Sequence, residues 1–388
     1  MSQLLPKGFV LKSPRYKYKL VRQLGQGSFG ITYLADIDIE ATLTLHTPIG
    51  DNTQTYRRPY PVCIKEFFMK DFTTRAEDGN AVVQSNPELV ESYSVQFLKE
   101  AQHLSKLSHQ GIIKVIEVFQ ANSTAYYAME YIEGGSLDDY IKKNGPLPEK
   151  ESIEILKDIA LSIGYMHQHH MLHLDLKPKN IMRRLNGHMV LIDYGLSKTF
   201  NDNGDPETSA NIGQGTVGYA PIEQASYKPG MGFPTTMDIY ALGGVLYKML
   251  FNQSPPSASQ ILEYGYPVQK LDERNASPML RKLATTLMNP YRQQRPQNIP
   301  QVLTQLDTML SAFSNQKEDT PATPVTPVMP NVKQQQDVRY NVSQKPVSAQ
   351  PSKQQPQSDD PDIIIVEDDA PQPSRQSNSQ VYEVIVVE

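Results

Sequence analysis

The octapeptide His173-Leu174-Asp175-Leu176-Lys177-Pro178-Lys179-Asn180 is the most informative stretch of this 388-residue chain. It follows a long helical pattern, and Pro178 prevents a helix from continuing through it. Thirteen residues after Asn180, Asp193-Tyr194-Gly195 follows the buried-strand pattern Met189-Val190-Leu191-Ile192. Asn180 and Asp193 offer the oxygen ligands that Mg²⁺ prefers when it also binds phosphate. Asp175 then remains free to accept a proton from a hydroxyl group.

The segment Gly25-Gln26-Gly27-Ser28-Phe29-Gly30 is a glycine-rich turn between two predicted strands, 18–24 and 32–35. Glycine lets backbone N–H groups approach phosphates without interference from a Cβ atom. In a dinucleotide-binding fold the same glycine spacing begins a helix. Because Ile31-Thr32-Tyr33-Leu34 is typical of a strand, we expect this turn to cover phosphates at the edge of a sheet.

Lys65 ends the apolar run Val62-Cys63-Ile64 inside a strand predicted over 61–68. An unpaired charge is very costly in a protein interior, so a buried lysine needs a counter-charge. The helix predicted over 94–107 carries Glu100, which we expect to be that partner. In the alternative, Lys65 lies at the surface and its ammonium group reaches solvent at the strand end.

Strands dominate the first third of the chain, and helices dominate after Gly134-Gly135. Two further strands are predicted over 112–119 and 125–131, and the alternation within 41–47 indicates an extra strand pair in the long connection 36–60. Helices are predicted over 136–144, 149–169, 237–251, 279–288 and 299–313. This order predicts an α+β fold of two lobes with a ligand between them.

In combination these motifs resemble the eukaryotic-type Ser/Thr protein kinase family over residues 15–310, and GSFGITYLA, KEFF, MEYIEGGSL and GYAPIEQ are most similar to bacterial members. The segment Gly215–Glu223 resembles the end of the activation segment, with an implied ion pair between Glu223 and Arg295. Asp238 matches the aspartate that starts a helix of the second lobe. The resemblance implies a bilobal kinase fold with a β-rich N-lobe over 15–132, an α-rich C-lobe over 133–313 and a tail over 314–388.

By the same resemblance, the chain uses ATP and Mg²⁺ to phosphorylate serine and threonine hydroxyls of proteins. Asp175 corresponds to the catalytic base, and Lys177 to the lysine that steadies the transferred phosphoryl group. Lys65, held by Glu100, would reach the α- and β-phosphates, and the adenine would lie on the backbone of residues 130–132. Asn180 and Asp193 correspond to the metal ligands. The implied nucleotide-binding positions are Leu24, Gly25, Gln26, Gly27, Ser28, Phe29, Gly30, Thr32, Cys63, Lys65, Met129, Glu130, Ile132 and Met182.

Leu174 replaces the arginine that normally holds a phosphate on the activation segment. The loop hydroxyls there are Ser197, Thr199, Thr208 and Ser209, and Lys198 is the nearby cation. One exposed ion pair contributes on the order of 0–1 kcal/mol. We therefore predict a basally active kinase, controlled by partners or abundance more than by its loop.

Two other classes of protein remain as alternatives. One is a pseudokinase scaffold that acts through partner binding by its tail, although all the catalytic residue types are present. The other is a small-molecule kinase of the aminoglycoside type. Lys177 and the segment Gly215–Glu223 argue against it, because in the resembled family these parts position a peptide.

Four histidines, His167, His169, His170 and His173, raise the question of a metal site. The resemblance instead implies that His173 is a structural residue beneath the aromatic ring of Tyr194. The other three lie at the end of a predicted helix, so we expect structural roles for the cluster.

The tail differs in composition from the rest of the chain. Residues 314–388 contain ten prolines, twelve glutamines and no glycine, and their six basic and eleven acidic residues account for the net charge of −5. Such a segment cannot offset the entropy of ordering, so we predict disorder. Ile363–Val366, followed by acidic residues, resembles a SUMO-interacting motif, but a generic sticky or self-docking segment is favoured, and Val384–Val387 is a second candidate for partner binding.

The single cysteine, Cys63, excludes a disulfide framework and a four-cysteine zinc site. No apolar run approaches the ~18–20 residues that span a membrane. The small net charge gives no argument for nucleic acid, and Tyr16, Tyr18 and Lys19 are interpreted as the surface of an edge strand. We expect a cytoplasmic protein, with secretion as an effector into a host cell as the alternative.

Overall fold

The computed structural model describes residues 3–27, 30–47, 50–77, 79–194, 198–199, 215–227 and 234–315. Residues 38–60 form one compact unit, and the other described residues form a second, larger one. Ser28, Phe29, Ser197, Thr208, Ser209 and the tail beyond residue 315, with both predicted partner-binding segments, lie outside the described residues. The predictions of a disordered tail and of its binding segments therefore stay predictions.

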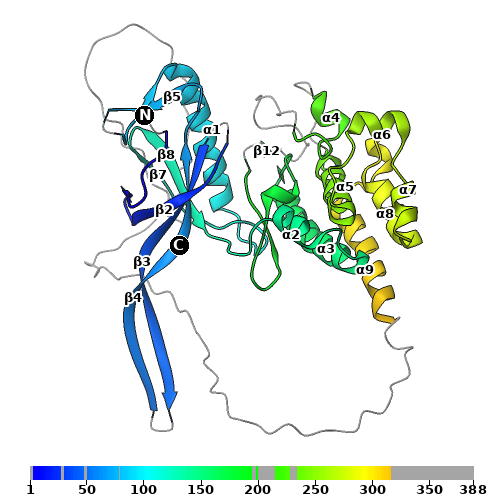
Figure 1. The fold of residues 1–388 in the computed structure, drawn as a ribbon, viewed down its shortest axis with the longest axis horizontal. Helices are drawn as coiled ribbons and strands as arrows, with labels where there is room; N and C mark the ends of the chain where they lie inside the picture. The colour runs from blue at the N-terminus through cyan, green and yellow to red at the C-terminus, as the bar shows by residue number, and fades with distance from the viewer. Residues whose placement is uncertain are drawn as a thin grey trace, which may run out of the picture. The chain divides into compact units, whose positions relative to one another are not determined.

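A six-stranded sheet with the strand order β1-β2-β3-β4-β8-β7 forms the first lobe (Figure 1). In that order the strands span Val10–Lys12, Lys17–Gln26, Gly30–Thr47, Gly50–Phe67, Thr124–Glu130 and Val115–Ala121. The strands predicted over 18–24, 32–35, 61–68, 112–119 and 125–131 overlap these elements. β1 lies N-terminal to residue 15, where the sequence prediction begins the lobe, and pairs antiparallel with β2.

The prediction that Tyr18 lies on the surface of an edge strand is wrong. Because β1 covers the outer side of β2, Tyr18 is not on an edge strand, and its side chain is fully buried. Its hydroxyl donates to Oε2 of the buried Glu117 at 2.8 Å, and its ring stacks on Phe119. The polar sequence around Tyr18 is typical of a surface strand, and only the partner carboxylate makes burial of the hydroxyl favourable.

Helix α1 (Pro87–Ser105) packs against β7 and β8. It begins seven residues before the predicted start at 94, because Asn86 and Pro87 form an N-terminal signal. The Asn86 side chain accepts a hydrogen bond from the N–H of Leu89, and proline suits the first helical position. A short hairpin of β5 (Thr73–Arg75) and β6 (Val82–Gln84) lies between β4 and this helix in the chain.

The long connection 36–60 is not a loop with an additional strand pair. β3 continues to Thr47 and β4 starts at Gly50, so the predicted extra pair at 41–47 is a continuation of two strands already present. Arg57 and Glu40 form an exposed ion pair at 3.3 Å within this extension. The prediction of a separate pair was wrong because alternation reports strand conformation but not where a strand begins.

The second lobe is built around α5 (Thr236–Phe251), in which every residue from 236 to 250 is buried. A helix that is apolar on all sides is expected at the centre of a helical layer. α3 (Glu149–Gln168) packs against α5 and against α9 (Ile299–Asn315), and α8 (Pro278–Leu287) packs against α5. The other helices are α2 (Leu137–Asn144), α4 (Ile222–Ala225), α6 (Ala258–Tyr264) and α7 (Gln269–Glu273).

Short elements between α3 and α4 carry the octapeptide and the residues after it. They are β9 (Met171–Leu172), the 3₁₀ turn η1 (Pro178–Asn180), β10 (Ile181–Arg183), β11 (Met189–Leu191) and β12 (Lys198–Thr199). A second 3₁₀ turn, η2 (Arg292–Gln294), precedes α9. β10 pairs with β11, β9 pairs with β12, and Ile112 of the first lobe bridges to Leu191. The predicted α+β fold with a strand-rich and a helix-rich lobe is confirmed.

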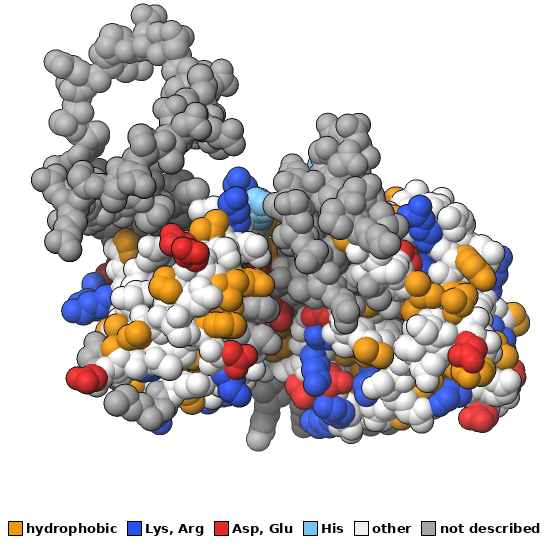
Figure 2. All heavy atoms as spheres, turned by 90° about the horizontal axis from the view of Figure 1, so that it is seen from above, with side chains coloured by type: hydrophobic (Ala, Val, Ile, Leu, Met, Phe, Trp, Pro, Cys, Tyr) orange, Lys and Arg blue, Asp and Glu red, His pale blue; other side chains and the backbone are white. Residues whose placement is uncertain are grey.

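Charged side chains of both signs are interspersed on the face seen in Figure 2. This agrees with the equal numbers of basic and acidic residues before residue 314. Within the part of the chain that the structure describes, no helix combines the length and apolarity that a bilayer crossing requires.

Candidate active site

Asp175 lies within a compact set of hydrogen bonds. Its Oδ2 accepts from Lys177 Nζ at 2.7 Å and from Asn180 Nδ2 at 3.0 Å, while its Oδ1 accepts from Thr216 Oγ1 at 2.6 Å. Lys177 Nζ also donates to the Thr216 hydroxyl, at 2.9 Å. A carboxylate that already accepts a hydroxyl hydrogen bond beside a lysine is suited to orient a hydroxyl group and to take its proton.

Asp238 holds the backbone of the octapeptide. Its two carboxylate oxygens accept from the N–H groups of His173 and Leu174, both at 2.9 Å, and His167 Nε2 lies 2.9 Å from Oδ2. Burial alone would raise the pKa of Asp238, but the hydrogen bonds and charge of His167 hold it below the usual value of 3.8. The ionised carboxylate supports Leu174 at a φ of 62°, a left-handed conformation that is unfavourable for a branched side chain.

Lys65 lies between two carboxylates. Its Nζ is 3.0 Å from Asp193 Oδ1 and 4.0 Å from Glu100 Oε1, so the predicted pair with Glu100 is present but Asp193 is nearer. Burial alone would lower the pKa of Lys65, but the Asp193 charge raises it well above its usual value. The Lys65 charge in turn lowers the pKa of Asp193. Both groups are therefore ionised at neutral pH, and the alternative of a surface lysine is wrong.

The glycines of the glycine-rich turn serve two different purposes. A Cβ atom on Gly30 would lie 2.8 Å from the carbonyl oxygen of Glu66, so this glycine permits close approach of β3 to β4. A Cβ atom on Gly25 or Gly27 would meet no atom within 4 Å. Those two glycines therefore leave room on the described side of the turn, as a phosphate-covering loop requires.

The remaining positions predicted for the nucleotide lie on neighbouring strands. Cys63 of β4 and Met129 of β8 are register partners, and Leu24 precedes Gly25, the register partner of Thr32. Burial raises the pKa of Cys63 to about 12, so the thiol is neutral. Ile132 follows β8 and is buried, whereas Met182 lies on β10 of the second lobe, where it bridges to Ser136.

Glu130, the last residue of β8, joins the two lobes through its side chain. Arg184 donates to both carboxylate oxygens, at 2.8 and 2.9 Å, and the N–H of Lys114 donates to Oε1 at 3.0 Å. Arg184 follows β10, so this bidentate pair ties the end of the sheet to the β10–β11 hairpin. The Glu130 carboxylate is thereby engaged within the protein, and its backbone N–H donates to the Lys114 carbonyl oxygen at 3.0 Å.

Asn180 and Asp193 are neighbours in the fold. The N–H of Ile192, next to Asp193, donates to the carbonyl oxygen of Asn180 at 2.9 Å. The Asn180 amide nitrogen donates to Asp175 O and Oδ2, which leaves its side-chain oxygen available as a ligand. The described residues contain no group of three or more His, Cys, Asp or Glu side chains that could hold a metal ion. Two oxygen ligands fit Mg²⁺, because it takes its other ligands from phosphate and water.

The end of the predicted activation segment is anchored by an ion pair. Arg295 Nη1 and Nη2 donate to Glu223 at 2.5 and 3.2 Å, as predicted, and the guanidinium also donates to three backbone carbonyls. Leu174 packs with Leu172, Met237 and Tyr227, so an apolar cluster stands where the resemblance places an arginine. Its carbonyl oxygen accepts from Gln224 Nε2 at 2.6 Å.

The histidine cluster has structural partners. His173 lies with its ring centroid 5.1 Å from that of Tyr194, as predicted, and burial lowers its pKa, so it is neutral at pH 7. His167 contacts Asp238, and the His169 ring packs on Tyr165. Each of these three histidines thus contacts a named side chain.

Sequence reasoning missed the buried carboxylate of Glu66, next to Lys65. A signal was available, since a charged residue inside an apolar strand must be either exposed or paired.

A family model for the protein kinase domain matches residues 79–306. Serine/threonine-protein kinase PknB of Mycolicibacterium smegmatis is 33% identical over 168 residues, which cover 42% of this chain and 26% of that protein. PknB of Mycobacterium tuberculosis is 31% identical over 179 residues, covering 45% and 28%. PrkC of Bacillus subtilis is 34% identical over 160 residues, covering 41% and 24%. The matched stretches thus span about a quarter of the length of these curated relatives.

Proposed function

The chain belongs to the protein kinase domain family, and we propose that it transfers the γ-phosphate of ATP to serine and threonine hydroxyls of proteins. The observation that carries this proposal is the set of contacts around Asp175. Lys177, Asn180 and Thr216 all lie within hydrogen-bond distance of its carboxylate. The names of the bacterial relatives support the Ser/Thr class.

Asp175 is the proposed base. A substrate hydroxyl that takes the place of Thr216 Oγ1 at Asp175 Oδ1 would donate its hydrogen bond there and pass its proton to the carboxylate as the oxygen attacks the γ-phosphorus. The bond from that phosphorus to the β–γ bridging oxygen would break, and ADP would leave. Lys177 Nζ, 2.7 Å from Asp175, would lie beside the transferred group and offset its charge. Positioning and charge stabilisation supply most of the acceleration in this chemistry.

Lys65 is proposed to bind the α- and β-phosphates. Asp193 balances its charge at 3.0 Å, and a polyphosphate would supply negative charge of the same kind. Glu100, 4.0 Å away, then keeps the ammonium group in place. The adenine is proposed to contact Cys63, Met129 and Met182 and the backbone of residues 130–132.

Asn180 and Asp193 are proposed as the ligands of Mg²⁺. The lowered pKa of Asp193 keeps its carboxylate ionised, as a ligand of a hard cation requires. When bound, the ion neutralises charge on the phosphate oxygens.

The first lobe, with β1 included, is proposed to extend to residue 132 and the second to the end of α9 at Asn315, with the residues after it as a separate tail, and the protein is proposed to be cytoplasmic. Among the described residues, Lys65, Asp175, Asn180 and Asp193 have charges and contacts that suit transfer, which supports a kinase over the pseudokinase alternative.

Replacement of Asp175 by asparagine tests the function. We expect Asp175→Asn to bind ATP as the unmodified chain does but to transfer phosphate to a generic protein substrate about 10²–10⁴-fold more slowly. The matched control is Asp307→Asn, because Asp307 is half-exposed on α9 and pairs only with Lys157. Unchanged transfer by Asp175→Asn would exclude this base, and no transfer by the unmodified chain would favour the pseudokinase.

A further inference from the structure

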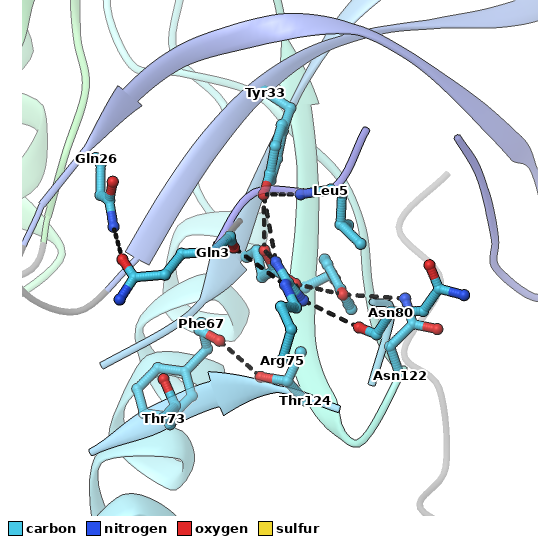
Figure 3. A network of polar contacts seen from close by, with 12 residues as sticks. Gln3, Leu5, Gln26, Tyr33, Phe67, Thr73, Arg75, Asn80, Asn122 and Thr124 are labelled. Atoms are coloured by element: carbon cyan, nitrogen blue, oxygen red, sulfur yellow. Dashed lines mark hydrogen bonds and ion pairs between the residues drawn. The ribbon is translucent and has the colours of Figure 1, made fainter. Parts of the chain in front are cut away.

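Behind the strand that carries Lys65 lies a buried polar network that no proposed step uses (Figure 3). Its centre is Glu66, whose side chain is fully buried. Oε1 accepts from Arg75 Nη1 at 2.7 Å and from Tyr126 at 2.6 Å. Oε2 accepts from Arg75 Nη2 at 2.5 Å and from Tyr33 at 3.1 Å. Each carboxylate oxygen therefore has two donors.

The hydrogen-bond donors of Arg75 are also all satisfied. A guanidinium group has five N–H donors, and here each has an acceptor. Besides Glu66, Nη1 donates to the Asn80 carbonyl at 3.0 Å, Nη2 contacts the Tyr33 hydroxyl at 3.4 Å, and Nε donates to the Gln3 carbonyl at 3.0 Å. A partly satisfied buried network is less stable than an apolar core, so the arrangement favours one geometry of all its members.

The segment 3–5 completes this network from outside the sheet. The carbonyl of Gln3 is the fifth acceptor of Arg75, and the N–H of Leu5 donates to the Tyr33 hydroxyl at 3.2 Å. The Leu5 side chain is 5% exposed, so it seals the site against water. Figure 3 shows both residues next to Arg75 and Tyr33.

The network lies one residue away from Lys65. In the ladder of β4 and β8, Lys65 is opposite Tyr127 and Glu66 is opposite Tyr126, so the two side chains point to opposite faces of the sheet. Because the two residues are adjacent in the strand, fixing Glu66 on one face therefore fixes the position of Lys65 on the other face.

The same network reaches α1. Arg75 ends β5, and the paired strand β6 leads within three residues to Pro87, the first residue of α1. The N–H of Val82 donates to the Asn122 carbonyl, and that of Ser85 to the Phe72 carbonyl. The hairpin is thus anchored on both sides just before the helix that carries Glu100.

We propose that Glu66 and Arg75 are positioning residues, and that seating of segment 3–5 on Tyr33 and Arg75 holds Lys65 and α1 in the arrangement that binds ATP. This inference rests on the proposed role of Lys65 in phosphate binding. It makes the segment before β1 an intramolecular part of the nucleotide site, and the segment also contacts the glycine-rich turn directly, where Gln3 Oε1 accepts from Gln26 Nε2 at 3.3 Å.

Leu5→Asp tests the proposal, because a carboxylate at this buried position would unseat the segment. Lys65 binds phosphates before and during transfer, so its misplacement should raise the KM for ATP about tenfold and leave kcat within about twofold. A purely structural role would instead lower the active fraction, and so kcat, at unchanged KM. The control is Val10→Asp, which introduces the same carboxylate on β1 at a position that is 44% exposed.

Amide hydrogen exchange provides a readout that needs no activity. In Leu5→Asp we expect faster exchange in α1 and unchanged exchange in α5. If the unmodified chain transfers no phosphate, the proposed function fails while this readout still tests the coupling to α1.

Tyr33→Phe is the milder second variant, because it removes one hydroxyl and keeps the ring. It should move KM and α1 exchange in the same direction as Leu5→Asp. If Leu5→Asp does not fold, the KM for ATP and the α1 exchange of Tyr33→Phe test the proposal. Unchanged KM and unchanged α1 exchange in the folded variants, or a loss of kcat alone, would overturn the proposal.

Discussion

Two carboxylates are fully buried, Glu66 in the sheet lobe and Asp238 in the helical lobe, and they obtain their hydrogen-bond donors in different ways. Asp238 accepts from two consecutive backbone N–H groups and from His167. Glu66 accepts from an arginine and two tyrosines that are 9, 33 and 60 residues away in sequence. The first carboxylate fixes a loop conformation, and the second fixes the relative positions of several segments.

The partners also differ in charge. Around Glu66 a permanent cation, Arg75, is buried with the carboxylate, so removal of one partner leaves the other charge unpaired. Around Asp238 the partners are two neutral backbone amides and a histidine, so a neutral side chain in place of Asp238 leaves no permanent charge unpaired and costs less. The comparison therefore predicts that the sheet lobe is the more sensitive to a neutralised carboxylate.

Glu66→Gln should have the largest effect on stability. It removes the counter-charge of Arg75, and breaking a buried pair costs about 3–5 kcal/mol. Chemical denaturation of the variant measures the loss. A double-mutant cycle with Arg75→Met should show a coupling of the order of 1–3 kcal/mol, and a coupling near zero would mean that the two charges do not support each other.

Asp238→Asn should cost less stability but more catalysis. The amide places an N–H₂ group against donors now held by the carboxylate, which leaves buried donors unsatisfied at a cost of about 1–3 kcal/mol. A displacement of the octapeptide His173–Asn180 by about 1 Å should lower kcat about 10²-fold. Denaturation and steady-state rates on one preparation separate the two effects.

The depressed pKa of Asp238 adds a pH signature to this prediction. A lowered folded-state pKa stabilises the protein above the unfolded value of 3.8, and this contribution is lost as the pH falls through the folded value. The unmodified chain should therefore lose more stability than Asp238→Asn as the pH falls below about 4. Parallel acid-denaturation curves for the two proteins would contradict the assignment.

Replacement of Ser197, Thr199, Thr208 and Ser209 by alanine should change initial rates by about fivefold at most. With Leu174 in an apolar cluster, a loop phosphate gains one exposed ion pair, on the order of 0–1 kcal/mol. The control replaces four hydroxyls of α9, Thr304, Thr308, Ser311 and Ser314, by alanine. A fall of more than about tenfold on an added peptide, with the fold intact, would refute basal activity.

A chain that ends at Asn315, the last residue of α9, should show the smallest effect. The tail is too polar to contribute a core, so kinase activity and Tm should stay unchanged. Differential scanning calorimetry of the two chain lengths is the measurement. A marked fall in Tm would show that an apolar island, such as Ile363–Val366, docks on the folded lobes.

The closeness of Asp175, Lys177 and Asn180 was predictable, whereas Thr216, 41 residues from Asp175, is brought to it only by the fold. Asp175, Lys177 and Asn180 lie within six residues, and a proline-containing segment of that length has few ways to arrange them. The ion pair of Lys65 with Glu100 also followed from the residues, because a buried charge demands an opposite one. The ion pair of Glu223 with Arg295 followed only from the family resemblance.

Burial of Tyr18, Glu66 and Arg75 was decided by the tertiary structure alone. Each is a polar side chain in a strand, and in a sequence such residues indicate exposure. Whether a polar group is exposed or buried depends on partners that the chain brings from far away, such as Glu117 for Tyr18 and Gln3 for Arg75. Residue type determines which hydrogen-bond or charge partners a buried group requires, but only the fold determines whether those partners are in place.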